Sequence, residues 1–208
     1  SAEIVAFDPS TDRLYIANSI GQKMDVVNFS NPAAPALITS ISMVPYGGIN
    51  SIVSKNGIVA VAVENANPQL NGSVVFFDQN GLFLNQVTVG AMPDMITFNQ
   101  DYTKVLTANE GEPNATYSVD PEGSVSIINI AGGIAALTQA NVTNISLSQY
   151  NGQEVALRAQ GIRIFTSSAS VAQDLEPEYI TVAADGTTAW VSLQENNAIA
   201  TIDVVNKQ

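Results

Sequence analysis

The chain has 208 residues, of which 46% are hydrophobic and 12% are charged, so it can bury a core and is not expected to be disordered. Nineteen Asp and Glu against seven Lys and Arg give a formal net charge of −12, which opposes binding to a nucleic-acid backbone. The sequence has no His and no Cys, which excludes Ser-His-Asp and Cys-His catalysis, disulfides, haem, iron–sulfur clusters and zinc held by His or Cys. We therefore expect no nucleic-acid partner and no organic cofactor, and any metal must be held by oxygen.

Four segments share one plan, in which a polar residue leads a short apolar strand that is followed by a turn, a second strand, a loop and a third strand. The first strands open at Glu3-Ile4-Val5, Asn50-Ser51-Ile52, Asp94-Met95-Ile96 and Glu178-Tyr179-Ile180. The second strands cover 13–17, 58–63, 104–108 and 189–193, and the third strands end at Asn28, Asp78, Asn129 and Asp203. A polar residue follows each second strand, 46 residues apart from Asn18 to Glu64 and from Glu64 to Glu110, and 85 apart from Glu110 to Glu195. The long interval indicates one period plus an insertion.

These runs are short and rich in β-branched residues, they are separated by turn residues such as Asn56-Gly57 and Asp185-Gly186, and they lack a convincing helical periodicity. A period near 45 residues with three or four strands per repeat predicts an all-β chain that folds as a β-propeller, one repeat per blade. We expect a single domain over 1–208. Its four blade-like repeats lie at about 1–45, 46–90, 91–131 and 174–208, with an insertion at about 132–173.

Outer, fourth strands are expected at 36–41 and 82–89, whereas only five residues follow Asp203 in the last repeat. Four repeats form an open arc unless they close into a four-bladed ring, and we expect an incomplete arc of a longer propeller with about seven blades. Unpaired strand edges invite association, so self-association through the open edges is also expected. Trp190 and the aromatic residues within strands, such as Tyr15, Phe76 and Phe77, are expected to pack between blades.

The sequence contains no run of about 18–20 apolar residues, the length that a membrane helix requires. The location of the protein is therefore inferred from other features. The opening Ser1-Ala2-Glu3 has neither a basic segment nor an apolar signal core, so a signal peptide is expected to be absent or already removed. The acidic, Cys-free composition suits a secreted, periplasmic or cell-surface protein, although some cytosolic proteins share it.

Several longer stretches carry a resemblance to a known family. They are 3–8, 46–51, 74–78, 108–113, 119–125, 174–179 and 193–198, which read EIVAFD, YGGINS, VVFFD, ANEGEP, VDPEGSV, DLEPEY and LQENNA. Together they resemble the choice-of-anchor I family over nearly the whole chain. The resemblance implies a secreted or surface β-propeller. Relatives include atypical alkaline phosphatase-like proteins and mesenchyme-specific cell-surface glycoproteins, and usual members of the family are longer than this chain.

Acidic residues gather in two short stretches and at equivalent positions of the repeats. In a shared register the inner strands are led by Asn50, Asp94 and Glu178. The loops after the second strands carry Glu64, Glu110 and Glu195 at the corresponding position. The candidate metal ligands are Asp94, Glu110, Glu112, Asp120, Glu122, Glu176, Glu178 and Glu195. Converging carboxylates repel one another unless a cation neutralises them, which points to Ca²⁺ or Mg²⁺ in a composite site, since neither stretch has the spacing of a twelve-residue calcium loop. The alternative is that these acids cap loops or are simply solvated.

Two classes of function remain open from the sequence. The first is a secreted or cell-surface propeller that binds an unknown protein, glycan or surface ligand, with Ca²⁺ as a stabilising ion. The second is a metal-dependent phosphomonoesterase like the alkaline phosphatase-like relatives, in which oxygen-bound metals would activate water. The first is preferred because seven basic residues and no His offer little to hold and attack a phosphate ester. Whether the chain is an enzyme stays open.

Overall fold

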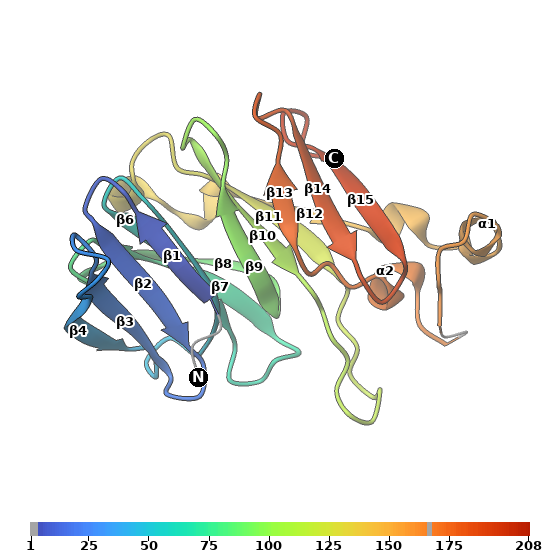
Figure 1. Ribbon diagram of the computed structural model, residues 1–208. Helices are drawn as coiled ribbons and strands as arrows, with labels where there is room; N and C mark the ends of the chain where they lie inside the picture. The colour runs from blue at the N-terminus through green and yellow to red at the C-terminus, as the bar shows by residue number, and fades with distance from the viewer. Residues whose placement is uncertain (1–3, 166–167) are drawn as a thin grey trace.

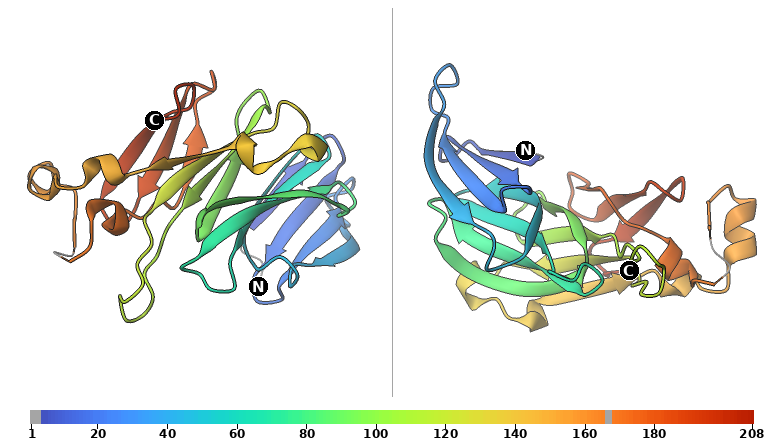
Figure 2. Two further views of the ribbon diagram at one scale, coloured as in Figure 1. Left: turned by 180° about the vertical axis from the view of Figure 1, so that it is seen from behind. Right: turned by 90° about the horizontal axis from the view of Figure 1, so that it is seen from below.

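The computed structural model of the protein describes residues 4–165 and 168–208 and consists almost entirely of antiparallel β-sheet (Figure 1). Strands that follow one another in the sequence pair with one another, and they form four sheets in chain order, which we call blades 1 to 4. Viewed from below, the blades follow one another along an open arc with blades 1 and 4 at its ends (Figure 2). The all-β, blade-like arc predicted from the repeats is confirmed.

Each blade begins with its inner strand, and its later strands follow outward in chain order. Blade 1 contains β1 (Ile4–Asp8), β2 (Arg13–Asn18), β3 (Lys23–Asn28) and β4 (Ala36–Ser42). Blade 2 contains β5 (Gly48–Lys55), β6 (Ile58–Glu64), β7 (Asn71–Asp78) and β8 (Phe83–Ala91). Blade 3 contains β9 (Pro93–Phe98), β10 (Lys104–Asn109), β11 (Ser124–Asn129) and β12 (Val142–Ser146). Blade 4 has three strands, β13 (Ile180–Val182), β14 (Thr188–Leu193) and β15 (Ala198–Asp203). Glu3, expected to lead the first inner strand, lies outside the described residues.

Short helices occur between β11 and β13, on either side of β12. They are the 3-10 helices η1 (Ile134–Ala136), η2 (Gln139–Asn141) and η3 (Ser148–Tyr150) and the α-helices α1 (Glu154–Ala159) and α2 (Val171–Asp174). Together with β12 they occupy the stretch 132–173 that the repeat spacing assigns to an insertion, and α2 ends one residue beyond it. The structure uses part of this stretch as the outer strand of blade 3, because β12 pairs with β11 from Ser124 opposite Ser146 to Ile128 opposite Val142. Among residues 4–165 and 168–208, no helix has the length and apolarity to cross a membrane.

Three layers of buried side chains separate the four blades. The first layer joins blades 1 and 2 through residues that include Tyr15, Met24 and Phe77, and the second joins blades 2 and 3. The third joins blades 3 and 4. Because blade 2 is covered on both faces, β6 is buried at five consecutive positions, and its sequence is apolar up to the final Glu64.

The aromatic residues behave as expected in the inner blades but not at the end of the arc. Tyr15, Phe76 and Phe77 are fully buried between blades, where burial of such a side chain contributes about 1.5–3 kcal/mol. Trp190 in β14 is instead 43% exposed. The expectation that Trp190 packs between blades is therefore not met within this chain, because its side of blade 4 is the end of the arc.

Candidate functional site

The acidic residues chosen from the sequence lie at one end of the inner strands. Asp94 is the second residue of β9, and Glu178 comes two residues before β13 begins. The inner strands of neighbouring blades contact one another, from β1 to β5, β5 to β9 and β9 to β13. The loop that follows β10 and the segment that precedes β13 meet at this end, and each of them carries several acids. We call this end of the molecule the acidic rim.

Two glycines allow the loop of 110–123 to lie directly against the segment of 175–177. A Cβ atom at Gly123 would lie 2.0 Å from the Leu175 carbonyl oxygen and 3.1 Å from that of Glu110, so only glycine fits there. Gly111 has a φ of +71°, which is strained for other residues, and a Cβ there would meet the Glu122 backbone at 2.8 Å. The close backbone approach brings the two acidic stretches together.

Buried amides hold this arrangement in place. Asn196, which is fully buried, donates through Nδ2 to the Asp174 carbonyl oxygen at 2.6 Å, and its Oδ1 accepts from the Glu176 N–H at 3.2 Å. The Gln173 Nε2 donates to the Asp120 carbonyl oxygen at 2.7 Å, which ties α2 to the loop after β10. These contacts fix the backbone positions from which the acids project.

The carboxyl groups act strongly on one another. Burial, together with the carboxylates of Asp94, Glu112, Glu176 and Glu178, raises the pKa of Glu110 to about 8. Glu110 is therefore largely protonated at neutral pH. A half-buried carboxyl group that is neutral for this reason releases its proton when a positive charge approaches.

A second acid shows the same behaviour. Burial, together with Glu112, Glu195, Asp174 and Asp120, raises the pKa of Glu176 to about 7. Glu176 therefore changes its charge close to neutral pH, in the same range as Glu110. Two neighbouring acids of the rim thus stay partly protonated at a pH where exposed acids are ionised.

Three other acids share the environment. Burial raises the pKa of Glu178, with Glu195 and Asp94 adding to the shift, and burial together with Asp174 raises the pKa of Asp120. The pKa of Glu64, at the end of β6, is raised by burial and by Asp94 and Glu112, although the Asn50 side chain lowers it by hydrogen bonding. The acids that lead inner strands and those that follow second strands therefore share one rim. The spacing of the repeats alone does not decide whether these two sets lie on the same face.

The structure brings together seven of the eight candidate ligands. Each of the seven acts on at least one other acid of the rim, and they are Asp94, Glu110, Glu112, Asp120, Glu176, Glu178 and Glu195. Glu122 is exposed, and its Oε2 accepts from the Ser146 hydroxyl at 3.2 Å. Glu64 and Asp174 join the rim although they are not among the eight candidates.

The fit of a metal ion to these residues can be tested on their arrangement. Within residues 4–165 and 168–208, no group of three or more acidic side chains is placed so that it could hold a metal ion. Glu110 and Glu176 also carry protons that a metal would have to displace. As the side chains stand, the rim is an acidic surface and does not form a coordination site.

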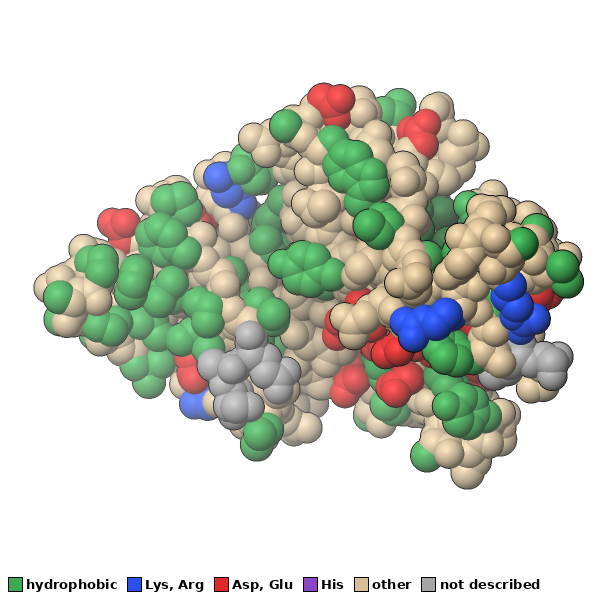
Figure 3. Space-filling model, turned by 45° about the vertical axis from the view of Figure 1, so that its right-hand side comes forward, with side chains coloured by type: hydrophobic (Ala, Val, Ile, Leu, Met, Phe, Trp, Pro, Cys, Tyr) green, Lys and Arg blue, Asp and Glu red, His purple; other side chains and the backbone are tan. Residues whose placement is uncertain are grey.

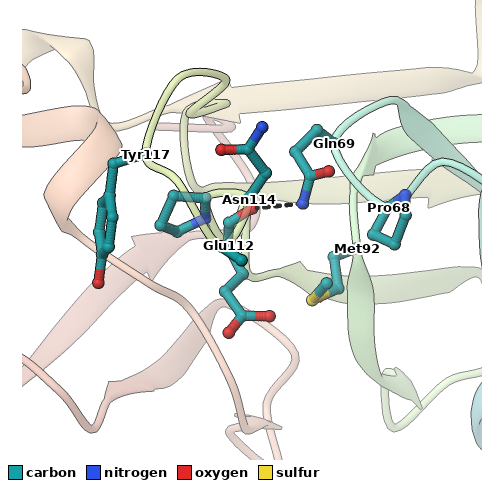
Figure 4. Close-up of a pocket in the computed structure, with 8 residues that line it drawn as sticks. Pro68, Gln69, Met92, Glu112, Asn114 and Tyr117 are labelled. Carbon is teal, nitrogen blue, oxygen red and sulfur yellow. Dashed lines mark hydrogen bonds between the residues drawn. The ribbon is translucent and has the colours of Figure 1, made fainter.

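A pocket of about 510 Å³ opens beside the rim. Its lining residues come from the loops after β6 and β10 and from Met92, and they are Pro68, Gln69, Met92, Glu112, Pro113, Asn114, Ala115 and Tyr117. The Gln69 Nε2 donates to the Glu112 carbonyl oxygen at 3.2 Å, which leaves the Glu112 carboxylate at the pocket (Figure 4). Tyr117 is 70% exposed and stands at the opposite side from Pro68. The pocket combines an acid, an aromatic ring and apolar walls.

Acidic side chains are visible as a group on one face of the molecule (Figure 3). The model of the choice-of-anchor I domain matches residues 3–208. This chain belongs to the choice-of-anchor I domain family. The resemblance inferred from the sequence is confirmed for the family. Curated proteins include no match to this chain.

Solved structures share the fold at low identity. A chain of Kuenenia stuttgartiensis hydrazine synthase is similar with a TM-score of 0.64 and 14% identity, over 99% of this choice-of-anchor I chain and 46% of the other. A Lactobacillus plantarum protein is similar with a TM-score of 0.62 and 14% identity, over 100% of this chain and 55% of the other. A chain of the nidogen/laminin complex is similar with a TM-score of 0.59 and 12% identity, over 100% of this chain and 61% of the other. This chain thus spans about half the length of these β-propeller-like neighbours.

Proposed function

We propose that this choice-of-anchor I domain is a secreted or surface-anchored β-propeller module that binds a positively charged protein segment on its acidic rim. The observation that carries the proposal is Glu110, a half-buried carboxyl group whose pKa is raised to about 8 by burial and by four neighbouring acids. The charged groups that act on it most strongly are all acidic. A cationic ligand would relieve this repulsion, so the rim is built for positive charge.

Three further observations support a binding role at a surface. The family is named for a choice of anchor, which suits a domain that is displayed outside the cell. One fold neighbour belongs to the nidogen/laminin complex, in which one protein binds another. The pocket next to the rim adds an exposed ring, Tyr117, and the Glu112 carboxylate, and both groups suit the side chain of Arg or Lys.

Ca²⁺, or Mg²⁺ in its place, is a second ligand that the same acids could take. Both ions bind oxygen ligands alone, and the acids supply only oxygen. In the described arrangement a bound ion would require the Glu110 and Glu176 side chains to lose their protons and turn toward one another. Ca²⁺ is therefore included as a separate arm of the test. No observation in the described residues favours the phosphomonoesterase alternative.

The test is calorimetric titration of the 208-residue chain with a peptide of alternating Arg and Gly, and separately with CaCl₂. We expect saturable peptide binding that becomes about tenfold tighter between pH 6 and pH 9, because Glu110 and Glu176 become charged over this range. Binding at about pH 7 should release protons, which appears as a dependence of the measured heat on the buffer. A control peptide of alternating Asp and Gly should not bind.

A pair of double variants separates the rim from general electrostatic attraction. Glu110→Gln with Glu176→Gln should lose most of the affinity and the proton release. Asp12→Asn with Glu154→Gln is the matched control, because it also removes two acids, at exposed or partly exposed positions in blade 1 and α1. Equal affinity in the two double variants, or no saturable binding of the Arg peptide, would overturn the proposed function. Saturable Ca²⁺ binding lost only in the rim variant would establish the ion as a ligand.

A further inference from the structure

The pocket beside the acidic rim lies away from both ends of the arc. Its walls come from the loop between β6 and β7, from Met92 between β8 and β9, and from the loop between β10 and β11. Blades 2 and 3 supply these segments, and each of the two blades packs against a neighbour on both of its faces. The shape of the pocket therefore does not depend on the uncovered faces of blades 1 and 4.

The pocket offers more apolar surface than one basic side chain covers. Its volume of about 510 Å³ lies in the range of about 300–1,000 Å³ that suits a ligand larger than a single side chain. The apolar walls are Pro68, Met92, Pro113, Ala115 and the Tyr117 ring. A basic residue with glycine on both sides would leave much of this surface in contact with water, which is unfavourable.

Tyr117 is held at the pocket in a backbone conformation that costs free energy. Its φ is +54°, in the left-handed region that a bulky side chain rarely adopts. Asn114 fixes this conformation, because its carbonyl oxygen accepts from the Tyr117 N–H at 2.8 Å and its Oδ1 accepts from the Ser118 N–H at 2.9 Å. The Tyr117 side chain is 70% exposed, so burial of the ring offsets little of the cost. Strain of this kind concentrates at positions that contact ligands.

Met92 is strained in the same way at another wall of the pocket. Its φ is +47°, and its carbonyl oxygen accepts from the Glu110 N–H at 2.9 Å, which ties it to the loop after β10. In the view of Figure 4 the Glu112 side chain extends between Tyr117 and Met92. The methionine side chain is flexible and polarisable, so it adapts to apolar groups of different shapes. The two strained residues thus present apolar surface on either side of a carboxylate.

Glu112 connects the pocket to the acidic rim. Its side chain lines the pocket, and its charge raises the pKa of Glu64, Glu110 and Glu176. A basic group that binds at the rim therefore lies within electrostatic reach of the pocket. The residue next to that basic group then meets the apolar walls.

We propose that the partner segment carries a large apolar residue next to a basic one, and that the pocket takes the apolar side chain while the acids take the basic one. The occupant is a segment of another protein whose positive charge complements the rim. This inference rests on the proposed function and adds a requirement to it. Charge brings the segment to the rim, and burial of the apolar side chain against Tyr117 selects it, as tyrosine does at many interfaces.

The test is calorimetric titration with two peptides, one of alternating Arg and Gly and one in which the central Gly is replaced by Leu. The Leu peptide should bind the unmodified chain about tenfold more tightly, because the walls bury part of the added side chain. Tyr117→Asn removes the ring and keeps a residue that tolerates the left-handed φ. It should reduce the ratio of the two affinities to less than about threefold. Tyr117→Phe keeps the ring and should keep the ratio at about tenfold.

Two controls separate the pocket from charge and from general effects on the fold. Tyr102→Asn is the matched control, because Tyr102 has a φ of +58° and lies in the turn between β9 and β10, at the opposite end of the blades from the rim. It should keep the ratio of the unmodified chain. The double variant Glu110→Gln with Glu176→Gln should weaken binding of both peptides and also keep the ratio, because it removes charge and leaves the apolar walls in place.

The outcomes distinguish this inference from the proposed function. Equal, saturable binding of the two peptides to the unmodified chain overturns the inference and leaves the proposed function standing. A tenfold ratio that persists in Tyr117→Asn also overturns it, because the Leu side chain then binds elsewhere. A neutral peptide of Leu and Gly that binds as tightly, or self-association of the chain that Tyr117→Asn abolishes, assigns the pocket to another occupant and likewise overturns it. If neither Arg peptide binds saturably, the proposed function fails as well.

Discussion

At the scale of single residues, the Glu110 carboxyl group makes the stability of the protein depend on pH. Its pKa is about 8 in the folded chain against an ordinary value of 4.5, so between these values the folded state holds a proton that the unfolded state has lost. The free energy of unfolding therefore falls as pH rises from about 5 to about 9. Glu110→Gln removes this dependence. We expect the variant to unfold a few degrees higher than the unmodified chain at about pH 9 and at nearly the same temperature at about pH 5.

The control for this prediction is Asp12→Asn, which removes an acid from an exposed turn of blade 1 at a φ of +51° that Asn tolerates. It should leave the pH dependence of unfolding unchanged. Thermal unfolding followed by circular dichroism at several pH values measures both variants. A Glu110→Gln variant that is less stable than the unmodified chain at about pH 9 would contradict the assignment of a strained, buried carboxyl group.

At the scale of elements, Gly123 decides how closely the loop after β10 approaches the segment before β13. A Cβ at this position would lie 2.0 Å from the Leu175 carbonyl oxygen and 2.6 Å from the Pro177 Cδ, so Gly123→Ala must push the two segments apart. We expect a loss of about 2–4 kcal/mol in the free energy of unfolding, measured with urea. Separation of the acids should also lower the pKa of Glu176 toward its ordinary value, which NMR titration of the carboxyl carbon would follow.

The segment between β11 and η1 offers a matched control. Gly132 has no atom within 4 Å of the position of a Cβ and does not have a positive φ of the kind that disfavours alanine. Gly132→Ala should change the free energy of unfolding by less than about 1 kcal/mol and leave the titration of Glu176 unchanged. If the two variants unfold alike, the close approach at Gly123 does not hold the rim together.

The elements also show where prediction from the sequence ends. Strands with a partner nearby in the chain were found from their apolar runs and turns, as with β6 and its turn at Asn56-Gly57. The outer strand β12 was missed because it follows two 3-10 helices and carries mixed polar residues, so no local period marks it. Asn196 was missed for a related reason. Its importance comes from burial beside Asp174, more than twenty residues away, and the sequence shows only one more Asn in a loop.

At the scale of the whole molecule, the repeat predicted both the arc and the meeting of the acids that lead the inner strands. Equivalent positions in a repeat must lie side by side if the repeats pack in register, and this reasoning placed Asp94 and Glu178 together. It could not predict which acids would be buried, because burial of Glu110 depends on the loop that Gly111 and Gly123 allow to fold over it. A composite metal site was a prediction of the same reasoning, and it stays a prediction.

Charge across the whole molecule leads to a final prediction about salt. The chain carries a formal net charge of −12, and nine of its acids are concentrated on one rim, so repulsion opposes the folded state most when the rim is fully ionised. Salt shortens the range of this repulsion, from about 10 Å at 0.1 M to about 3 Å at 1 M. We expect added NaCl to raise the unfolding temperature by several degrees at about pH 9 and by clearly less at about pH 5, where Glu110 and Glu176 are neutral. Calorimetry at the two pH values measures both shifts. Equal shifts would mean that the rim does not dominate the repulsion, since the rest of the surface changes its charge little between these two conditions.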